Sequence, residues 1–440
     1  MKIRGSLQII NKTTVSSRRF ISNQVSFTVR NHSVQGNTVN DSESGTKALP
    51  KLSIPLLKAK SHLGHYSKRM NRLYNEDKYS VNVVDLPMKL DDYGLDKWIK
   101  QSCFAASVFD GHGGDQTSTY LQNHLHGAIE SCNPTEENLY QIMKTYSENI
   151  GVYWKRLYRR KNDIFKGLKV QPSDIDDVRL RLYQTYLEQD YKILMKQSEV
   201  LKKSNHVITS GSTGTTILLY NLNIRDHDHL YFNANTISRL HVSQIGDTKA
   251  IIIDKDGEAH ALNSIHHPSS TLESERLNKY SAGFLTDSFG ENRFLNFANT
   301  RAFGDITGKS KGLSAEPDIT SYIIGDPSII MKENLANETI AGKGGGECFI
   351  VLFSDGVSNF ATDQEIGDLV MSTVNRKRGR ATPQDCAEEI VKYVDAIGGD
   401  DNATAIVVRL LNWGGWPNLD RTGQLREDKL KDGISKMEKR

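Results

Sequence analysis

The sequence contains few cysteines, and none of them is spaced to bind zinc. Only four occur in 440 residues, without CxxC spacing, which favours reduced thiols in a core or a helix over a disulfide framework. No apolar run approaches the roughly eighteen residues of a membrane-spanning helix, so no transmembrane segment is predicted. The GxxxxGK[ST] motif of a phosphate-binding loop is also absent. The glycine cluster at 341–347 is therefore predicted to be a flexible loop rather than a phosphate-binding site.

Acidic residues are absent from the first forty positions, which carry six basic residues and many Ser and Thr. This composition is typical of a mitochondrial transit peptide, and RRFIS at 18–22 resembles a matrix-processing site. We therefore predict a transit peptide over 1–40 and a location in the mitochondrial matrix or intermembrane space; a disordered basic tail is the alternative. Without these six charges the net charge changes from +3 to −3, so the body offers no overall basic surface for nucleic acid.

The remaining chain could form one large domain or two ordinary ones. Residues 41–60 are polar at first and are predicted to be a linker, and residues 413–440 a charged tail. Apolar periodicity predicts helices over 115–130, 135–161 and 173–203, the last with Ser173 as its N-cap. Two later helices are signalled by Thr362 with Glu365 and by Thr382 with Asp385.

Acidic residues mark the ends of several predicted strands. Asp110 follows the apolar run 104–109, Asp355 follows the run 349–353, and Asp401 precedes the run 403–410; Asp247 interrupts two more runs. One Asp-Gly turn alone is weak evidence of chemistry, but four such acids can converge at one edge of a sheet. Carboxylates without Cys or His clusters favour Mg²⁺ or Mn²⁺ over zinc. DKDGE at 254–258 lacks the further acids of a calcium loop and is predicted to be a hairpin turn.

The motifs occur in the order RxxxED, FDGHGG, GSTGTT, GD, RAFGD, SDG and DDNATAIVV. This ordered set, over about residues 65–411, resembles the metal-dependent protein serine/threonine phosphatases of the type 2C family. The resemblance implies an α+β fold with a central β-sandwich of two antiparallel sheets flanked by helices. It places the catalytic domain over 61–412, with a two-metal site at one edge of the sandwich.

The resemblance also assigns metal ligands. Two Mg²⁺ or Mn²⁺ ions, bridged by Asp110, would activate the water that attacks phosphorus. The remaining ligands would be Glu76, the Gly111 carbonyl, Asp355 and Asp401. Asn359 stands where many members carry a second acid, which predicts that a third metal binds weakly.

Other residues match supporting roles in the family. Arg72 corresponds to the arginine that binds the phosphate, for which its planar fork is suited. His112 corresponds to the general acid that protonates the departing Ser or Thr oxygen. Asp77 corresponds to a residue that orients metal-bound water or the arginine, and Thr213 and Asp247 lie near the region of the third metal.

The sequence thus predicts a mitochondrial, metal-dependent protein phosphatase acting on phosphoserine and phosphothreonine. Similarity to fungal mitochondrial members points to the pyruvate dehydrogenase alpha subunit as a substrate and to mitophagy as a process. Substrate choice is expected to depend on the divergent segment 266–294 and on a helical insertion over 133–205. A catalytically silent phosphoprotein-binding module is one alternative, although the full set of acids speaks against it. A hydrolase of small phosphoesters or nucleic acid is another, and it would need a basic channel.

Overall fold

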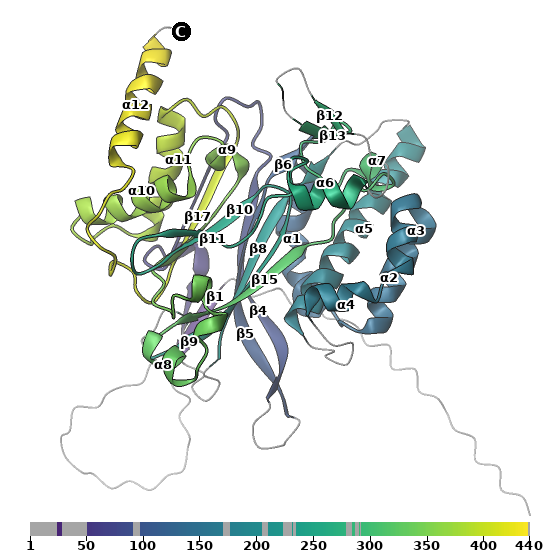
Figure 1. The fold of residues 1–440 in the computed structure, drawn as a ribbon, viewed down its shortest axis with the longest axis horizontal. Coiled ribbons are helices and arrows are strands. Elements are labelled where there is room, and N and C mark those ends of the chain that lie inside the picture. The colour runs from purple at the N-terminus through teal and green to yellow at the C-terminus, as the bar shows by residue number, and fades with distance from the viewer. Residues whose placement is uncertain are drawn as a thin grey trace, which may run out of the picture.

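Two five-stranded antiparallel sheets form the centre of the protein (Figure 1). The computed structural model describes residues 24–28, 51–90, 97–169, 177–204, 210–222, 231, 235–278, 284–286, 290 and 292–438. The first sheet has the order β15-β9-β8-β5-β4 and comprises β4 (Lys78–Leu90), β5 (Lys97–Phe109), β8 (Gly214–Asn221), β9 (Ile237–Ile245) and β15 (Asp318–Gly325). The second has the order β11-β10-β16-β17-β3 and comprises β3 (Leu63–Lys68), β10 (Lys249–Ile253), β11 (Ala259–Ala261), β16 (Phe349–Phe353) and β17 (Ala403–Arg409).

The alternation of side chains along β16 shows how the layers are built. Ile350 and Leu352 pack between the two sheets, together with residues of β5, β8 and β9. Phe349, Val351 and Phe353 point to the other face and pack against α10 (Asp363–Arg376) and α11 (Pro383–Ala396). A strand alternates its faces with a period of two, and here both faces are buried. The predicted sandwich of antiparallel sheets flanked by helices is confirmed.

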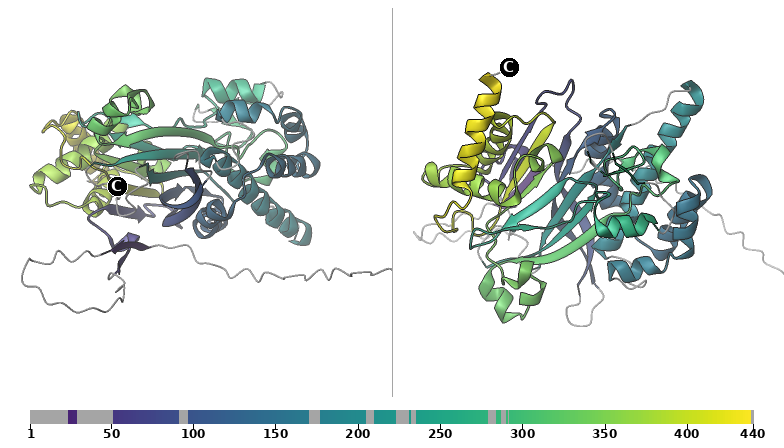
Figure 2. Two further views of the ribbon diagram at one scale, coloured as in Figure 1. Left: turned by 90° about the horizontal axis from the view of Figure 1, so that it is seen from below. Right: turned by 45° about the horizontal axis from the view of Figure 1, so that its top comes forward.

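Helices cover the outer faces of both sheets (Figure 2). α1 (Gln116–Ser131) and α5 (Val178–Ser204) pack on the first sheet. α2 (Glu136–Asn149), α3 (Val152–Arg159) and α4 (Asp163–Leu168) form a further apolar cluster with α5. The prediction of one helix over 135–161 is wrong, because Gly151 has a φ of 105° and separates α2 from α3. The predicted N-cap Ser173 lies outside the described residues.

Both predicted N-caps of the later helices are confirmed. The side chains of Thr362 and Thr382 accept hydrogen bonds from backbone N–H groups three residues later. In return, the carboxylates of Glu365 and Asp385 accept bonds from the N-cap backbone. These capping boxes fix where α10 and α11 begin, and therefore how they lie on the second sheet.

The N-terminal side contains more regular structure than the sequence indicated. β2 (Lys51–Pro55) and the 3-10 turn η1 (Leu56–Lys58) lie within the predicted linker 41–60. β2 pairs with β1 (Gln24–Thr28), which lies within the predicted transit peptide. The rest of residues 1–40 lies outside the part of the chain that the structure describes.

The predicted charged C-terminal tail, 413–440, contains a helix that packs on the domain. α12 (Gly423–Glu438) lies beside α10 and α11 (Figure 1), and Lys429 Nζ is 2.8 Å from Glu365 Oε1 of α10. Trp416 is buried against Phe349 of β16, with ring centroids 5.4 Å apart. The charged composition concealed this docking, because charged residues of the tail, Arg426 and Lys429 among them, take part in it.

Short elements complete the fold. They comprise β6 (Gly111–His112), β7 (Gly211–Ser212), β12 (Phe284–Thr286), β13 (Asn292–Phe294), β14 (Phe303–Gly304), α6 (Thr271–Asn278), α7 (Ile306–Lys309), α8 (Pro327–Lys332), η2 (Ala336–Glu338), η3 (Ile340–Gly342) and α9 (Asp355–Ser358). The predicted flexible loop 341–347 is instead held at its end, where Gly325 N donates to the buried Glu347 Oε2 over 3.1 Å. Among the described helices, none has the length and apolar character to cross a membrane.

Candidate metal centre

Strand ends and one helix start bring the sequence-predicted acids together. Asp110 directly follows β5, Asp355 begins α9 after β16, and Asp401 lies two residues before β17. Asp355 N lies 3.4 Å from Asp110 Oδ2. The charges of Asp355, Asp77 and Asp247 all act on Asp110, and those of Asp247 and Asp401 act on Asp355. The four strand-end acids and Asp77 therefore lie close enough for their charges to act on one another, and together they are called the carboxylate cluster.

The cluster has more negative charge than its surroundings neutralise. Burial raises the pKa of Asp110 well above its usual value, and the neighbouring carboxylates raise it further. For the same reasons the pKa values of Asp77 and Asp355 rise to about 7. Asp77 Oδ1 is buried without a hydrogen-bond partner. A buried set of carboxylate oxygens that raise one another's pKa values fits a hard divalent ion, which prefers oxygen ligands.

Glu76 and Gly111 meet at a tightly packed point beside Asp110. Gly114 N donates to Glu76 Oε1 over 2.7 Å, and Ser118 Oγ donates to Glu76 O over 2.6 Å. A Cβ atom at Gly111 would lie 2.5 Å from Glu76 O and 2.7 Å from Ser118 Oγ. Only glycine allows β6 to approach the Glu76 backbone this closely. The close approach places two predicted ligands, Glu76 and the Gly111 carbonyl, next to each other.

Asn402 fastens the loop that carries Arg72 and Glu76, a role that sequence reasoning missed. Its Nδ2 donates to Arg69 O over 2.8 Å and to Tyr74 O over 3.0 Å, while its Oδ1 accepts from Glu76 N over 2.8 Å. The only signal was its place after two acids in DDNATAIVV. Three bonds from one amide hold the loop against the start of β17.

Arg72 lies at the solvent side of the cluster. Its Nη2 is 2.5 Å from Asp401 Oδ2, and 58% of its side chain is exposed. An exposed guanidinium paired with a single carboxylate oxygen keeps donors available for an incoming anion.

His112 pairs with Asp305, which the sequence did not single out although it lies in the RAFGD motif. His112 Nε2 is 2.7 Å from Asp305 Oδ2, and the Asp305 side chain is almost fully buried. Burial by itself lowers the pKa of His112, but the charge and hydrogen bond of Asp305, with Asp247 and Glu76, outweigh it and raise the pKa. The pair favours a protonated imidazole next to the acids.

The predicted supporting residues, Asp77, Thr213 and Asp247, belong to the cluster or adjoin it. Asp77 Oδ2 accepts hydrogen bonds from Ser354 Oγ and Thr404 Oγ1, each over 2.7 Å, and so ties the ends of β16 and β17 together. Thr213 N donates to Asp110 O over 2.9 Å. Asp247 Oδ2 accepts from Asn299 over 2.8 Å. At the site of the missing second acid, Asn359 Nδ2 lies 3.4 Å from Asp355 Oδ2.

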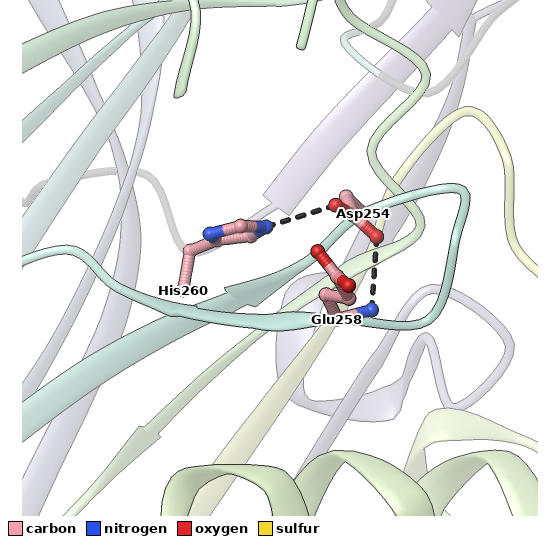
Figure 3. A group of neighbouring side chains, drawn as sticks. All are labelled: Asp254, Glu258 and His260. Carbon is pink, nitrogen blue, oxygen red and sulfur yellow. Dashed lines mark hydrogen bonds and ion pairs between the residues drawn. The ribbon is translucent and has the colours of Figure 1, made fainter. Parts of the chain in front are cut away.

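A second group of possible ligands, Asp254, Glu258 and His260, lies elsewhere (Figure 3). Asp254 and Glu258 lie on the turn between β10 and β11, the hairpin that the sequence predicted, and His260 lies in β11. His260 Nε2 is 2.8 Å from Asp254 Oδ2, and Lys343 Nζ is 3.0 Å from Glu258 Oε2 and 3.5 Å from Asp254 Oδ2. Because these acids already pair with Lys343 and His260, the group is better explained as a brace of the hairpin than as a metal site.

The raised pKa values predict how the stability of the metal-free protein depends on pH. Asp77 and Asp355 have pKa values near 7 in the folded state and about 4 when unfolded. Their stabilising contribution is therefore complete below about pH 4 and is lost as the pH rises through about 7. With chelator, the Tm is expected to fall as the pH rises from about 4 to about 7, and Mg²⁺ should remove most of that fall. Thermal melts at each pH, with chelator and with Mg²⁺, measure the pH dependence of the Tm and the effect of the metal on it. Identical pH profiles of the Tm in the two conditions would contradict the prediction.

Comparisons with known proteins place the chain in one family. The sequence profile of the protein phosphatase 2C family matches residues 137–403. Protein phosphatase 2C homolog 4 of Schizosaccharomyces pombe is 30% identical over 385 residues, which cover 86% of this chain and 88% of that protein. A probable mitochondrial protein phosphatase 2C member 13 of rice is 24% identical, with 79% and 67% covered. The mitochondrial protein phosphatase 1K of Xenopus laevis is 28% identical, with 58% and 57% covered.

Proposed function

The chain belongs to the protein phosphatase 2C family and is a metal-dependent serine/threonine phosphatase, and we propose that the carboxylate cluster around Asp110 is its active centre. The observation that carries the proposal is the convergence of Asp110, Asp355 and Asp401 beside the exposed Arg72. A phosphomonoester dianion resists attack by hydroxide, so its hydrolysis needs positive charge at just such a place.

The proposed ligands of two Mg²⁺ or Mn²⁺ ions are Glu76, Asp110, the Gly111 carbonyl, Asp355 and Asp401. When bound, the ions would supply positive charge to the phosphoryl oxygens and lower the pKa of an attacking water. Asp77 would keep the ends of β16 and β17 in register through Ser354 and Thr404, and so hold Asp355 and Asp401 in place. Thr213 and Asp247 would support the same edge, with a weaker third site next to Asn359.

Arg72 and His112 would act on the substrate directly. If the side chain of Arg72 rotates away from Asp401, its guanidinium can donate hydrogen bonds to two phosphoryl oxygens at once. Because Nε2 of His112 is bonded to Asp305, Nδ1 is the atom left to donate a proton to the departing Ser or Thr oxygen. The raised pKa of His112 keeps that proton available closer to neutral pH.

The activity assay is the test of this proposal. The purified protein should release phosphate from phosphoserine and phosphothreonine peptides with Mg²⁺ or Mn²⁺, lose that activity with EDTA, and regain it when the metal is restored. Okadaic-acid-type inhibitors should have little effect. Activity that survives EDTA, or that needs zinc, would contradict the two-metal centre. Peptide binding without turnover would favour the silent binding module instead.

We propose a mitochondrial location and, as one candidate substrate, the pyruvate dehydrogenase alpha subunit, with a link to mitophagy. The location rests on the composition of residues 1–40, and two relatives bear mitochondrial names while the fission yeast relative does not. Processing near 18–22 rather than at 40 would leave β1 in the mature protein to pair with β2. The substrate rests on resemblance to fungal members alone.

Targeting by the N-terminal segment can be measured directly. Residues 1–40 fused to a fluorescent protein should carry it into mitochondria, because import machinery reads positive charge and amphipathic character. Replacing Arg18 and Arg19 with Gln should slow processing of the fusion, as followed by gel mobility. A fusion that stays in the cytosol would contradict the transit peptide and leave the basic tail as the explanation.

A further inference from the structure

One buried ion pair connects the inserted helices with the His112–Asp305 pair. Asp190 Oδ2 of α5 lies 2.9 Å from Lys309 Nζ of α7, and neither side chain is exposed. The roles assigned above use neither residue. A buried ion pair often adds no stability over an apolar pair of similar volume, so stability alone does not explain these charges.

The ion pair holds the backbone on both sides of Phe303. Gly304 N donates to Asp190 Oδ1 over 2.7 Å, and Lys309 Nζ donates to Ala302 O over 2.5 Å. Tyr146 of α2 donates its hydroxyl to Asp190 Oδ2 over 2.6 Å. Asp190 therefore joins α2, α5 and α7 to the segment that leads directly into Asp305.

The backbone of that segment is unusual. Gly304 and Asp305 have consecutive positive φ angles of 72° and 53°, and a non-glycine residue keeps such a conformation only when its surroundings hold it. The turn directs the Asp305 carboxylate to His112 across the small sheet β14-β7-β6. A Cβ atom at Gly211 of β7 would lie 2.2 Å from Asp305 Oδ2 and 2.3 Å from His112 Nε2, so the space for the pair is closely defined.

We propose that Asp190 is a positioning residue for the phosphatase reaction. Together with Lys309 it holds the Gly304–Asp305 turn, and that turn sets Asp305 against His112 so that proton delivery to the leaving oxygen is aligned. The inserted helices α2 and α5 would thus affect one specific step, the protonation of the leaving oxygen, rather than only enlarge the domain. This inference rests on the general-acid role of His112 in the proposed function.

A purely structural brace makes a different prediction. A brace that only joins α5 to α7 would, when removed, lower the Tm and affect all substrates alike. A positioning residue should instead affect substrates according to how much their leaving groups need a proton. Phosphoserine has a poor leaving group, whereas p-nitrophenyl phosphate needs little proton assistance.

The main test replaces the pair in the full-length protein as Asp190→Leu with Lys309→Met. These side chains have similar volume and leave no unpaired charge, but Gly304 N loses its acceptor. With saturating Mg²⁺, kcat on a phosphoserine peptide should fall about tenfold, and kcat on p-nitrophenyl phosphate should change less than about twofold. In a His112→Gln background the pair replacement should cause no further loss on the peptide, because both changes act through the same group.

A second variant keeps the test decisive if the pair replacement does not fold. Tyr146→Phe removes the hydrogen bond to Asp190 and a second one to Leu187 O within α5. It should lower peptide turnover by roughly threefold with little effect on p-nitrophenyl phosphate. Tyr140→Phe is the matched control, since the Tyr140 hydroxyl of the same helix interacts with Asn162 and Glu136 and not with Asp190.

Equal losses on both substrates, losses that add to that of His112→Gln, or no change in any variant would overturn the inference. Failure of the unmodified protein to hydrolyse either substrate would instead overturn the proposed function. If the unmodified protein hydrolyses both and the substrate ratio does not move, only the role of Asp190 is rejected.

Discussion

Asp110→Asn is expected to lower turnover at least a thousandfold on every substrate, roughly to the background rate. The amide has the size of the carboxylate but lacks the charge that would hold both cations. Metal affinity should fall in parallel, since Asp110 lies at the centre of the cluster with Asp355, Asp77 and Asp247. Titration calorimetry with Mn²⁺ and phosphate-release assays measure the two effects.

Asp400→Asn is the matched control for this variant. Asp400 directly precedes Asp401 but is exposed, so its replacement removes one negative charge near the site without removing a proposed ligand. It should leave both Mn²⁺ affinity and turnover within about twofold of the unmodified protein. If Asp110→Asn behaved like Asp400→Asn, the cluster would not be the active centre.

His112→Gln is expected to separate proton donation from metal binding. Turnover of a phosphoserine peptide should fall roughly 100-fold or more, because a serine alkoxide is a poor leaving group. The loss on p-nitrophenyl phosphate should be much smaller, and Mn²⁺ affinity should be nearly unchanged. The same two assays used for Asp110→Asn supply both numbers.

The opposing result for His112 is equally definite. His112 lies next to Gly111 in the short strand β6, so a residue that only shaped this strand would disturb the metal centre when replaced. Equal losses on the two substrates, together with weakened Mn²⁺ binding, would therefore reject the general acid and leave a purely structural histidine.

The parts of the fold that follow from local sequence could be predicted. β16 coincides with its apolar run, and the caps at Thr362 and Thr382 start α10 and α11 where the sequence indicated. These features depend only on residues that are close together in the sequence. The break at Gly151 was missed because the apolar pattern continues from α2 into α3 and only the φ angle of that glycine reveals the turn.

The site residues that the sequence missed act through long-range contacts. Asp305 meets His112 across three short strands, although 193 positions separate them. Asn402 fastens a loop more than 300 positions away. The sequence motifs contain both residues, but nothing in the neighbouring sequence indicates which distant residue each one contacts. Their hydrogen-bond partners could therefore not be predicted.

The docking of α12 determines how a truncating mutation near the C-terminus would affect the protein. Trp416, buried on Phe349, and Lys429, paired with Glu365, close the outer helical layer from its C-terminal side. A premature stop codon just after position 412 would yield a chain that retains every proposed catalytic residue but exposes aromatic surface. Quality-control proteases degrade such chains, so the phenotype would arise from missing protein rather than from impaired chemistry.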